Sequence, residues 1–175
     1  MTPANTDTSR PQIFKALNVL YRKVTKHMKD TLEGLTGQTS NIGVVVGDSL
    51  RQITESCETS ASLMKAHVFE NEEEYVAYMT DLEDLFTTMM DQLQWLHQQQ
   101  LRNLFDTNES RSEVRSEVVR LESGASTLFS AIKPKVPEGP EDPLFPRFRV
   151  TFKEFRLTVL KGLSKWLSEF YPPQL

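Results

Sequence analysis

Cysteine is almost absent from this chain, and its scarcity limits how the fold can be held together. Cys57 is the one cysteine among 175 residues, so no disulfide can form within the chain. The fold must therefore be held by apolar packing, and the chain suits a reducing compartment. We expect the Cys57 thiol to be a small buried hydrophobic group.

Long apolar runs are also missing. No stretch approaches the roughly 18 consecutive apolar residues that a membrane span requires. The first ten residues are polar and lack the apolar region of a secretion signal. These two absences predict a soluble protein that is made in the cytoplasm and does not bind membranes.

An excess of basic residues is lacking as well. The formal net charge is -4 and the isoelectric point is near 5.5. This balance argues against nucleic-acid binding, because a phosphate backbone needs a basic face. The 38% of hydrophobic residues suffices for one domain with a core. We expect a disordered N-terminus over residues 1–9 and a single helical-bundle domain over residues 10–175.

Patterns that carry catalysis or metal binding are not found. His27, His67 and His97 lie on separate segments, and there is no HExxH or CxxC pair. The glycines do not form a phosphate-binding loop. The sequence therefore predicts a protein that is not an enzyme and has no metal, cofactor or small-molecule substrate.

Apolar residues at helical spacing are what the chain does contain. The first stripe comprises Ile13, Leu17, Leu20, Val24, Met28, Leu32 and Leu35. Further stripes predict helices over residues 48–68, 75–104, 114–132 and 148–170. Asn71 with Glu74, and Ser110 with Glu113, resemble capping boxes that open the third and fourth helices. We interpret the glycine-containing segment 38–47 as a loop.

Prolines recur at every third residue before the last helix, at positions 134, 137, 140, 143 and 146. Three residues is the period of a polyproline II helix, which is long enough here to cross a bundle. A crossing strut would make the last two helices parallel. The fold class expected is therefore an all-α, up-up-down-down four-helix bundle with an extra helix in the first crossover. The prolines could instead be a ligand for a proline-recognising domain.

Charge is segregated between the predicted helices. Basic residues dominate the first and last helices, whereas residues 67–100 contain no Lys or Arg and many carboxylates. Neighbouring helices that complement one another explain this pattern, and a binding surface is the alternative. Trp95 lies beside the apolar stripe of its helix, which makes it a candidate anchor for a protein partner.

The last helix contains the pattern Leu157-Thr-Val-Leu-Lys-Gly-Leu-Ser-Lys-Trp166, and the first contains Leu20-Tyr-Arg-Lys-Val24. These stretches resemble the last and first helices of the ciliary neurotrophic factor and cardiotrophin family. The resemblance implies a helical cytokine or growth factor that engages receptors of the haematopoietic class. In that family a Phe-x-x-Lys motif at the start of the last helix contacts a receptor. Here the candidate partner-binding residues of this region are Phe148, Phe152, Lys153 and Arg156, in a different register.

Two functions follow, both based on protein binding. The first is a cytokine that reaches cell-surface receptors after unconventional release, and it requires the last two helices to be parallel. The second is an intracellular adaptor or an assembly subunit of a larger complex. The cytokine is the more specific prediction, from the bundle order, the strut and the resemblance, whereas the lone cysteine and the missing secretion signal support the second.

Overall fold

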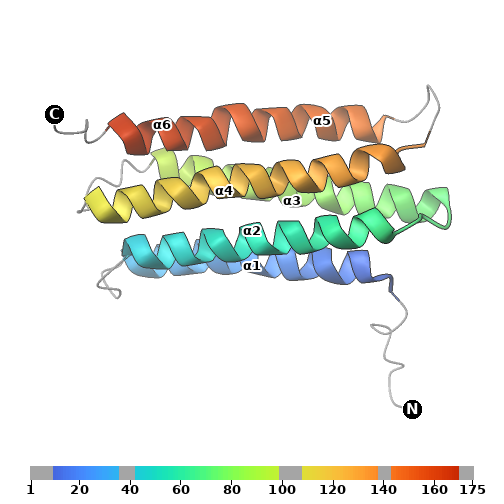
Figure 1. The fold of residues 1–175 in the computed structure, drawn as a ribbon, viewed down its shortest axis with the longest axis horizontal. Helices are drawn as coiled ribbons and strands as arrows, with labels where there is room; N and C mark the ends of the chain where they lie inside the picture. The colour runs from blue at the N-terminus through green and yellow to red at the C-terminus, as the bar shows by residue number, and fades with distance from the viewer. Residues whose placement is uncertain (1–9, 36–41, 99–107, 138–142, 170–175) are drawn as a thin grey trace, which may run out of the picture.

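The fold is built from long helices, as the stripes predict. The computed structural model describes residues 10–35, 42–98, 108–137 and 143–169 (Figure 1). They form α1 (Gln12–Leu35), α2 (Ile42–Ala66), α3 (Glu72–Gln98), α4 (Asn108–Ile132), a 3-10 turn η1 (Lys133–Lys135), α5 (Leu144–Glu154), a π-helical segment η2 (Phe155–Leu160) and α6 (Lys161–Glu169). No β-strand occurs in these ranges, which confirms the all-α class. The N-terminus predicted to be disordered, residues 1–9, lies outside them.

The segments α5, η2 and α6 join end to end as one rod, called here the last helix (Figure 1). The residues at the junctions, Phe155 and Lys161, keep right-handed helical dihedrals. A π-helical turn holds an extra residue and therefore shifts the register of the side chains after it. In this segment Phe155, Val159 and Leu160 are buried.

Successive helices alternate in direction (Figure 1). Phe129, near the end of α4, stacks on Phe145, near the start of the last helix. Farther along, Arg156 pairs with Glu122, one to two turns back in α4. The last helix therefore runs antiparallel to α4, and the predicted up-up-down-down order is wrong. Within the described residues, α1, α2, α3, α4 and the last helix follow one another in up-and-down order.

The proline-rich segment does not cross the bundle. Pro134 lies in η1, Pro143 is the N-cap of α5, and Pro146 lies in the first turn of that helix. Proline is tolerated in a first helical turn because its missing N–H has no partner to lose there. The predicted bundle-crossing strut is therefore wrong, since both of its ends lie at the same end of the bundle. Pro140 lies outside the described residues.

The helix α2 starts earlier than the sequence predicts, because its glycines serve a helix contact. A Cβ atom on Gly43 would lie 2.7 Å from the Cβ of Ser110, and one on Gly124 would lie 3.0 Å from Cγ2 of Thr54. The helices α2 and α4 thus run in the same direction with their backbones close together. Residues 42–47, predicted as part of a loop, belong to α2, whereas residues 38–41 lie outside the described ranges.

Ser110 does not open α4, although Ser110 and Glu113 resemble a capping box. The helix begins two residues earlier, at Asn108. Ser110 lies within the first turn and packs against Gly43 of α2. Its small side chain therefore permits a helix contact, and the predicted start of α4 is wrong by two residues.

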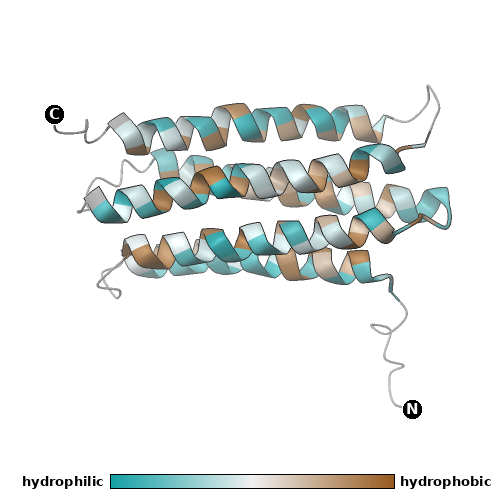
Figure 2. Ribbon diagram, in the orientation of Figure 1, coloured by the Kyte–Doolittle hydropathy of each residue, from teal (hydrophilic) through white to brown (hydrophobic). Residues whose placement is uncertain are grey.

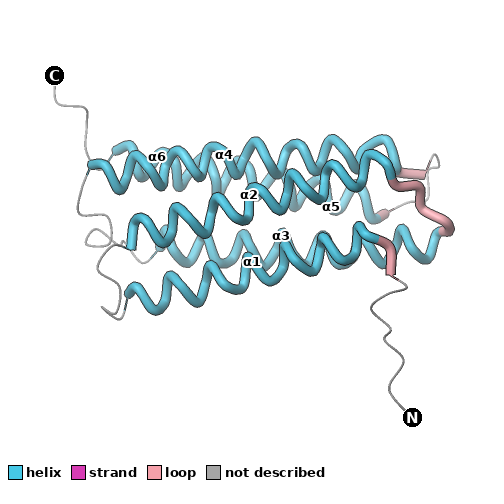
Figure 3. The backbone as a smooth tube through the Cα atoms, turned by 60° about the horizontal axis from the view of Figure 1, so that its bottom comes forward, coloured by secondary structure: helices cyan, strands magenta, loops and turns pink. Residues whose placement is uncertain are grey.

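The helices surround one core in the order α1, α2, α4, last helix, α3, and back to α1 (Figure 3). Figure 2 shows apolar residues recurring along every helix, between stretches of hydrophilic residues. Every helix contributes buried side chains to a single cluster. Cys57 is fully buried in it, as predicted. The candidate binding features must therefore lie on the outside or at the ends of the bundle.

The buried face of α1 departs from its apolar stripe after Val24. His27, Thr31 and Gly34 continue the buried face, whereas Leu32 is 42% exposed. Met28 is half-buried. Buried positions follow steps of three and four residues along α1, so a polar pair occupies core positions that the stripe assigns to Met28 and Leu32. The reason is the neighbour, because Ser49 of α2 offers His27 a hydrogen-bond partner.

Two glycine substitutions test the close contact between α2 and α4. Gly43→Ala should lower the melting temperature, because the new methyl group meets the Cβ of Ser110 at 2.7 Å. Gly162→Ala is the matched control, since nothing lies within 4 Å of its Cβ position. Alanine stabilises a helix by about 1 kcal/mol relative to glycine, so the control should raise the melting temperature. Equal shifts of both variants in thermal denaturation would contradict the contact.

Candidate functional site

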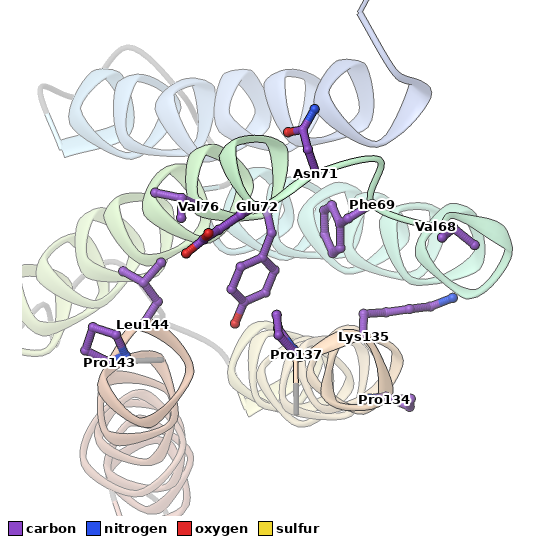
Figure 4. A pocket seen from close by; sticks show the side chains of 11 residues that line it. Val68, Phe69, Asn71, Glu72, Val76, Pro134, Lys135, Pro137, Pro143 and Leu144 are labelled. Atoms are coloured by element: carbon purple, nitrogen blue, oxygen red, sulfur yellow. The ribbon is translucent and has the colours of Figure 1, made fainter. Parts of the chain in front are cut away.

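A cavity at one end of the bundle is the main candidate site, and we call it the end pocket. It has a volume of about 940 Å³ and is partly open to solvent (Figure 4). Three segments form it. They are the connection from α2 to α3 together with the start of α3, the turn η1 together with Pro137, and the start of α5. The lining residues are Val68, Phe69, Asn71, Glu72, Tyr75, Val76, Pro134, Lys135, Pro137, Pro143 and Leu144. Its size is within the range of ligand-binding pockets.

The wall formed by the α2–α3 connection is held by a helix cap. The side-chain oxygen of Asn71 accepts a hydrogen bond from the backbone N–H of Glu74 at 2.8 Å, and the Glu74 carboxylate accepts one from the N–H of Glu70 at 2.9 Å. The second Glu74 oxygen lies 2.6 Å from Nε2 of His67. The Asn71 half of the predicted capping box is confirmed, whereas the Glu74 carboxylate accepts from the N–H of Glu70 in place of that of Asn71. The cap makes the pocket wall a defined structure.

Lys135 ties η1 to the other wall. Its ammonium group donates hydrogen bonds to the carbonyl oxygens of His67 at 2.7 Å and Lys65 at 3.2 Å. These carbonyls belong to the C-terminal end of α2, where the helix leaves acceptors without intrahelical donors and where a positive charge is favourable. The Lys135 ammonium therefore serves the fold.

The mouth of the end pocket is apolar and acidic. Val68 is 76% exposed and Val76 is 39% exposed, and both line the pocket. The deeper aromatic side is formed by Phe69, whose ring lies 5.4 Å from that of Tyr75 in an edge-to-face contact. Glu72 is the acidic residue of the lining. Exposed valines beside an open pocket are a feature of surfaces that bind apolar groups.

Two residues predicted to contact a partner, Phe148 and Phe152, are instead part of the core. They are 1% and 4% exposed. The Phe152 ring stacks on Phe129 of α4 at 4.5 Å. The rings of Phe148 and Phe152 both meet Phe86 of α3 edge to face. The prediction is corrected for these two residues, because the antiparallel last helix turns them toward α3 and α4.

The other predicted residues do not form one surface. Arg156 is half-buried and donates two hydrogen bonds, at 3.3 and 3.1 Å, to one oxygen of Glu122 in α4. Its guanidinium also lies 6.0 Å from the centre of the Phe152 ring. Lys153 is exposed on the last helix, and Trp95 is half-buried near the end of α3. The structure thus brings Arg156 to Phe152 and leaves Trp95 apart from both.

A buried serine–histidine pair lies between α1 and α2, but its geometry does not activate the serine. Nδ1 of His27 is hydrogen-bonded to the Ser49 hydroxyl. That hydroxyl donates to the carbonyl oxygen of Val46 at 2.9 Å, so the ring nitrogen acts as the donor. An activated nucleophile needs the opposite arrangement, in which histidine accepts the hydroxyl proton. Burial lowers the pKa of His27 to about 4, although the Asp30 carboxylate opposes this shift.

Cys57 and Tyr78 are also buried. Burial, aided by the nearby Glu58 carboxylate, raises the pKa of the Cys57 thiol to about 12. Burial raises the pKa of Tyr78 as well, with a smaller contribution from Cys57. A thiol must ionise to act as a nucleophile. Cys57 is therefore inert at neutral pH in this conformation.

A second, smaller hollow lies between α1 and α3. Its volume is about 500 Å³, and its lining includes Tyr21 of α1 with Asp81, Asp84, Thr87 and Thr88 of α3.

Among the residues in the described ranges, no group of three or more His, Cys, Asp or Glu side chains could hold a metal ion. None of the described helices combines the length and the apolar character needed to cross a membrane.

Reasoning from the sequence missed the end pocket. The sequence predicts that Val68 belongs to the apolar stripe of the second helix, yet α2 ends at Ala66 and Val68 is exposed. One local signal was present, because an aromatic residue just before a helix cap often packs on the first turns of that helix. Phe69 does so on Tyr75. The contribution of η1 depends on the return of the chain, which has no local signal.

Comparison with known proteins adds no assignment: no protein-family model matches the chain, and no curated protein is significantly similar to it in sequence.

His27 predicts a pH-dependent stability. Its folded-state pKa of about 4 is below the ordinary value of 6.5, so the unfolded chain binds the proton more tightly. Stability should be unaffected above pH 6.5 and should fall as the pH drops toward 4, by about 2 kcal/mol at pH 5. Urea denaturation at several pH values measures this. His27→Gln should remove most of the slope, while the exposed control His97→Gln should keep it, and equal slopes would contradict the assignment.

Lys135 predicts a local stability effect. Lys135→Met should lower the free energy of unfolding by about 1 kcal/mol, because two charge-assisted hydrogen bonds to α2 are lost. Lys133→Met is the matched control, since Lys133 is exposed on the same turn. Chemical denaturation measures both variants. A Lys133 effect as large as that of Lys135 would show that the cap does not hold η1 to α2.

Proposed function

We propose that this chain is a non-catalytic, protein-binding helical bundle, acting as an adaptor or as an assembly subunit of a larger complex. Its end pocket binds an apolar side chain of the protein partner. The observation that carries the proposal is the exposure of Val68 and Val76 at the mouth of a defined apolar cavity. Apolar anchors that fill such cavities supply much of the binding energy in protein interfaces.

The lining supports a binding role over a catalytic one. Its polar side chains are Asn71, Glu72, Tyr75 and Lys135. Asn71 caps α3 and Lys135 caps α2, so both already serve the backbone. Catalysis needs a nucleophile beside a base or an acid–base pair in the cavity. Glu72 and Tyr75 are the polar residues that remain, and they do not form a nucleophile–base pair with another residue of the lining. The pocket is therefore better suited to bind an apolar group than to catalyse a reaction.

The order of the helices favours the adaptor over the cytokine. The cytokine interpretation requires the last two helices to be parallel, and α4 and the last helix are antiparallel. Phe148 and Phe152, the aromatic residues of its receptor-binding region, are buried. An adaptor or assembly subunit does not need parallel last helices, so the observed up-and-down order is compatible with it. The compartment in which the adaptor acts stays a prediction.

The test is affinity capture with matched surface variants. The wild-type chain and Val119→Lys should retain the same stoichiometric partner, because Val119 is 51% exposed on α4 and is not part of the pocket. Val68→Lys with Val76→Lys should weaken binding at least about tenfold, since two charged groups would enter an apolar contact. Circular dichroism checks that all variants fold. Partner binding that survives the double substitution, or a partner lost equally with Val119→Lys, would overturn the proposal.

A further inference from the structure

Neighbouring helices on one side of the bundle carry opposite charges. Helix α3 contains seven carboxylates and no Lys or Arg. The last helix, next to it, contains six Lys and Arg residues. Glu73, Asp81, Asp84 and Asp91 are exposed on α3 and are called the acidic face, and Arg149, Lys153 and Lys161 are exposed on the last helix and are called the basic face. Glu72, which lines the end pocket, and Arg147 and Lys165 are also exposed but belong to neither face.

Few of these charged residues form ion pairs between α3 and the last helix of the same molecule. Arg147 pairs with Glu83 at 2.7 Å, and this ion pair joins α3 to the last helix. Within the described part of the chain, no residue of the acidic face lies within ion-pair distance of a basic group. The same holds, among those residues, for the basic face. Most of the segregated charge is therefore not explained by contacts inside the bundle.

The basic face also carries exposed apolar side chains. Val150 is 58% exposed and Leu157 is 47% exposed. Both lie on the last helix among Arg149, Lys153 and Lys161. A helix surface that combines exposed apolar and basic side chains suits a partner helix with acidic side chains. The acidic face of α3 has this chemistry.

We propose that two copies of this chain form a dimer in which the acidic face of each α3 packs against the basic face of the other copy's last helix. The contact is separate from the end pocket, since no residue of either face lines that pocket. Asp84 and Asp91 of one copy face Arg149 and Lys153 of the other. Val150 and Leu157 supply the apolar part of the contact.

The arrangement of the two helices permits a closed pair. In one molecule α3 and the last helix lie side by side and run in the same direction, because Glu83 meets Arg147 and Phe86 meets both Phe148 and Phe155. Consider a two-fold axis that runs parallel to the two helices, midway between them and just outside the molecule. It therefore places each α3 opposite the other copy's last helix, twice. Such an isologous interface closes at two subunits and forms no fibre.

Sedimentation velocity of the wild-type chain at low and high ionic strength is the first measurement. A dimer is expected at low ionic strength, with the dimer fraction falling as salt screens the exposed charges. Asp84→Lys with Asp91→Lys places positive charges at the contact positions of α3, and Arg149→Glu with Lys153→Glu places negative charges at the contact positions of the last helix. Each doubly substituted chain should be monomeric alone, because both halves of its interface then carry like charges.

Mixing the two substituted chains gives the deciding result. In the mixed pair the lysines placed on α3 of one chain face the glutamates placed on the last helix of the other, and the two unchanged helices also face each other. Dimers should therefore return on mixing. The control Arg22→Glu with Arg115→Glu changes the net charge as much as the last-helix variant, at exposed sites outside both faces, and should remain dimeric.

Three outcomes would overturn the proposal. They are a wild-type chain that stays monomeric at low ionic strength, substituted chains that stay dimeric, or a mixture that stays monomeric while both chains keep the wild-type circular dichroism spectrum. Failure of the dimer leaves the adaptor proposal standing, because affinity capture depends on Val68 and Val76 and not on these charges.

Discussion

The stacking of Phe152 on Phe129 fixes the position of the last helix, and several other features depend on it. The ring centres are 4.5 Å apart, and Phe86 of α3 meets Phe152 edge to face. Phe129 lies near the end of α4, so the chain must turn back at once to bring Phe152 beside it. This return places η1 and the start of α5 next to the start of α3, and the end pocket forms where these segments meet.

The same return explains why the charged helices are neighbours. Since Phe148, Phe152 and Phe155 all meet Phe86, the basic last helix must lie along the acidic α3. Apolar area, which dominates the free energy of packing, decides this arrangement, and exposed charges contribute little to it. The charges are therefore free to serve recognition between molecules. The end pocket and the pair of charged faces lie at different places on the surface, and both follow from the stacking of Phe152 on Phe129.

Close backbone packing and a buried polar pair shape the other half of the bundle. Gly43 and Gly124 let α2 and α4 approach, at a cost in helix propensity that the closer packing offsets. On α1, His27 takes a core position because Ser49 satisfies its ring nitrogen. A buried polar group without a partner would be costly, so this pair also sets the register between α1 and α2.

The sequence by itself determined the all-α class, the burial of Cys57 and the cap at Asn71 and Glu74, because these depend on periodicity and on neighbours within one or two turns. Much of the helix content follows from the same local patterns. The tertiary structure alone decided the direction of the last helix, the early start of α2 and the end pocket. Each of these depends on residues far apart in the chain, such as Phe129 with Phe152 or Gly43 with Ser110. Such contacts leave no periodic signal, since their free energy comes from a complementarity of shape that exists only after the helices have met.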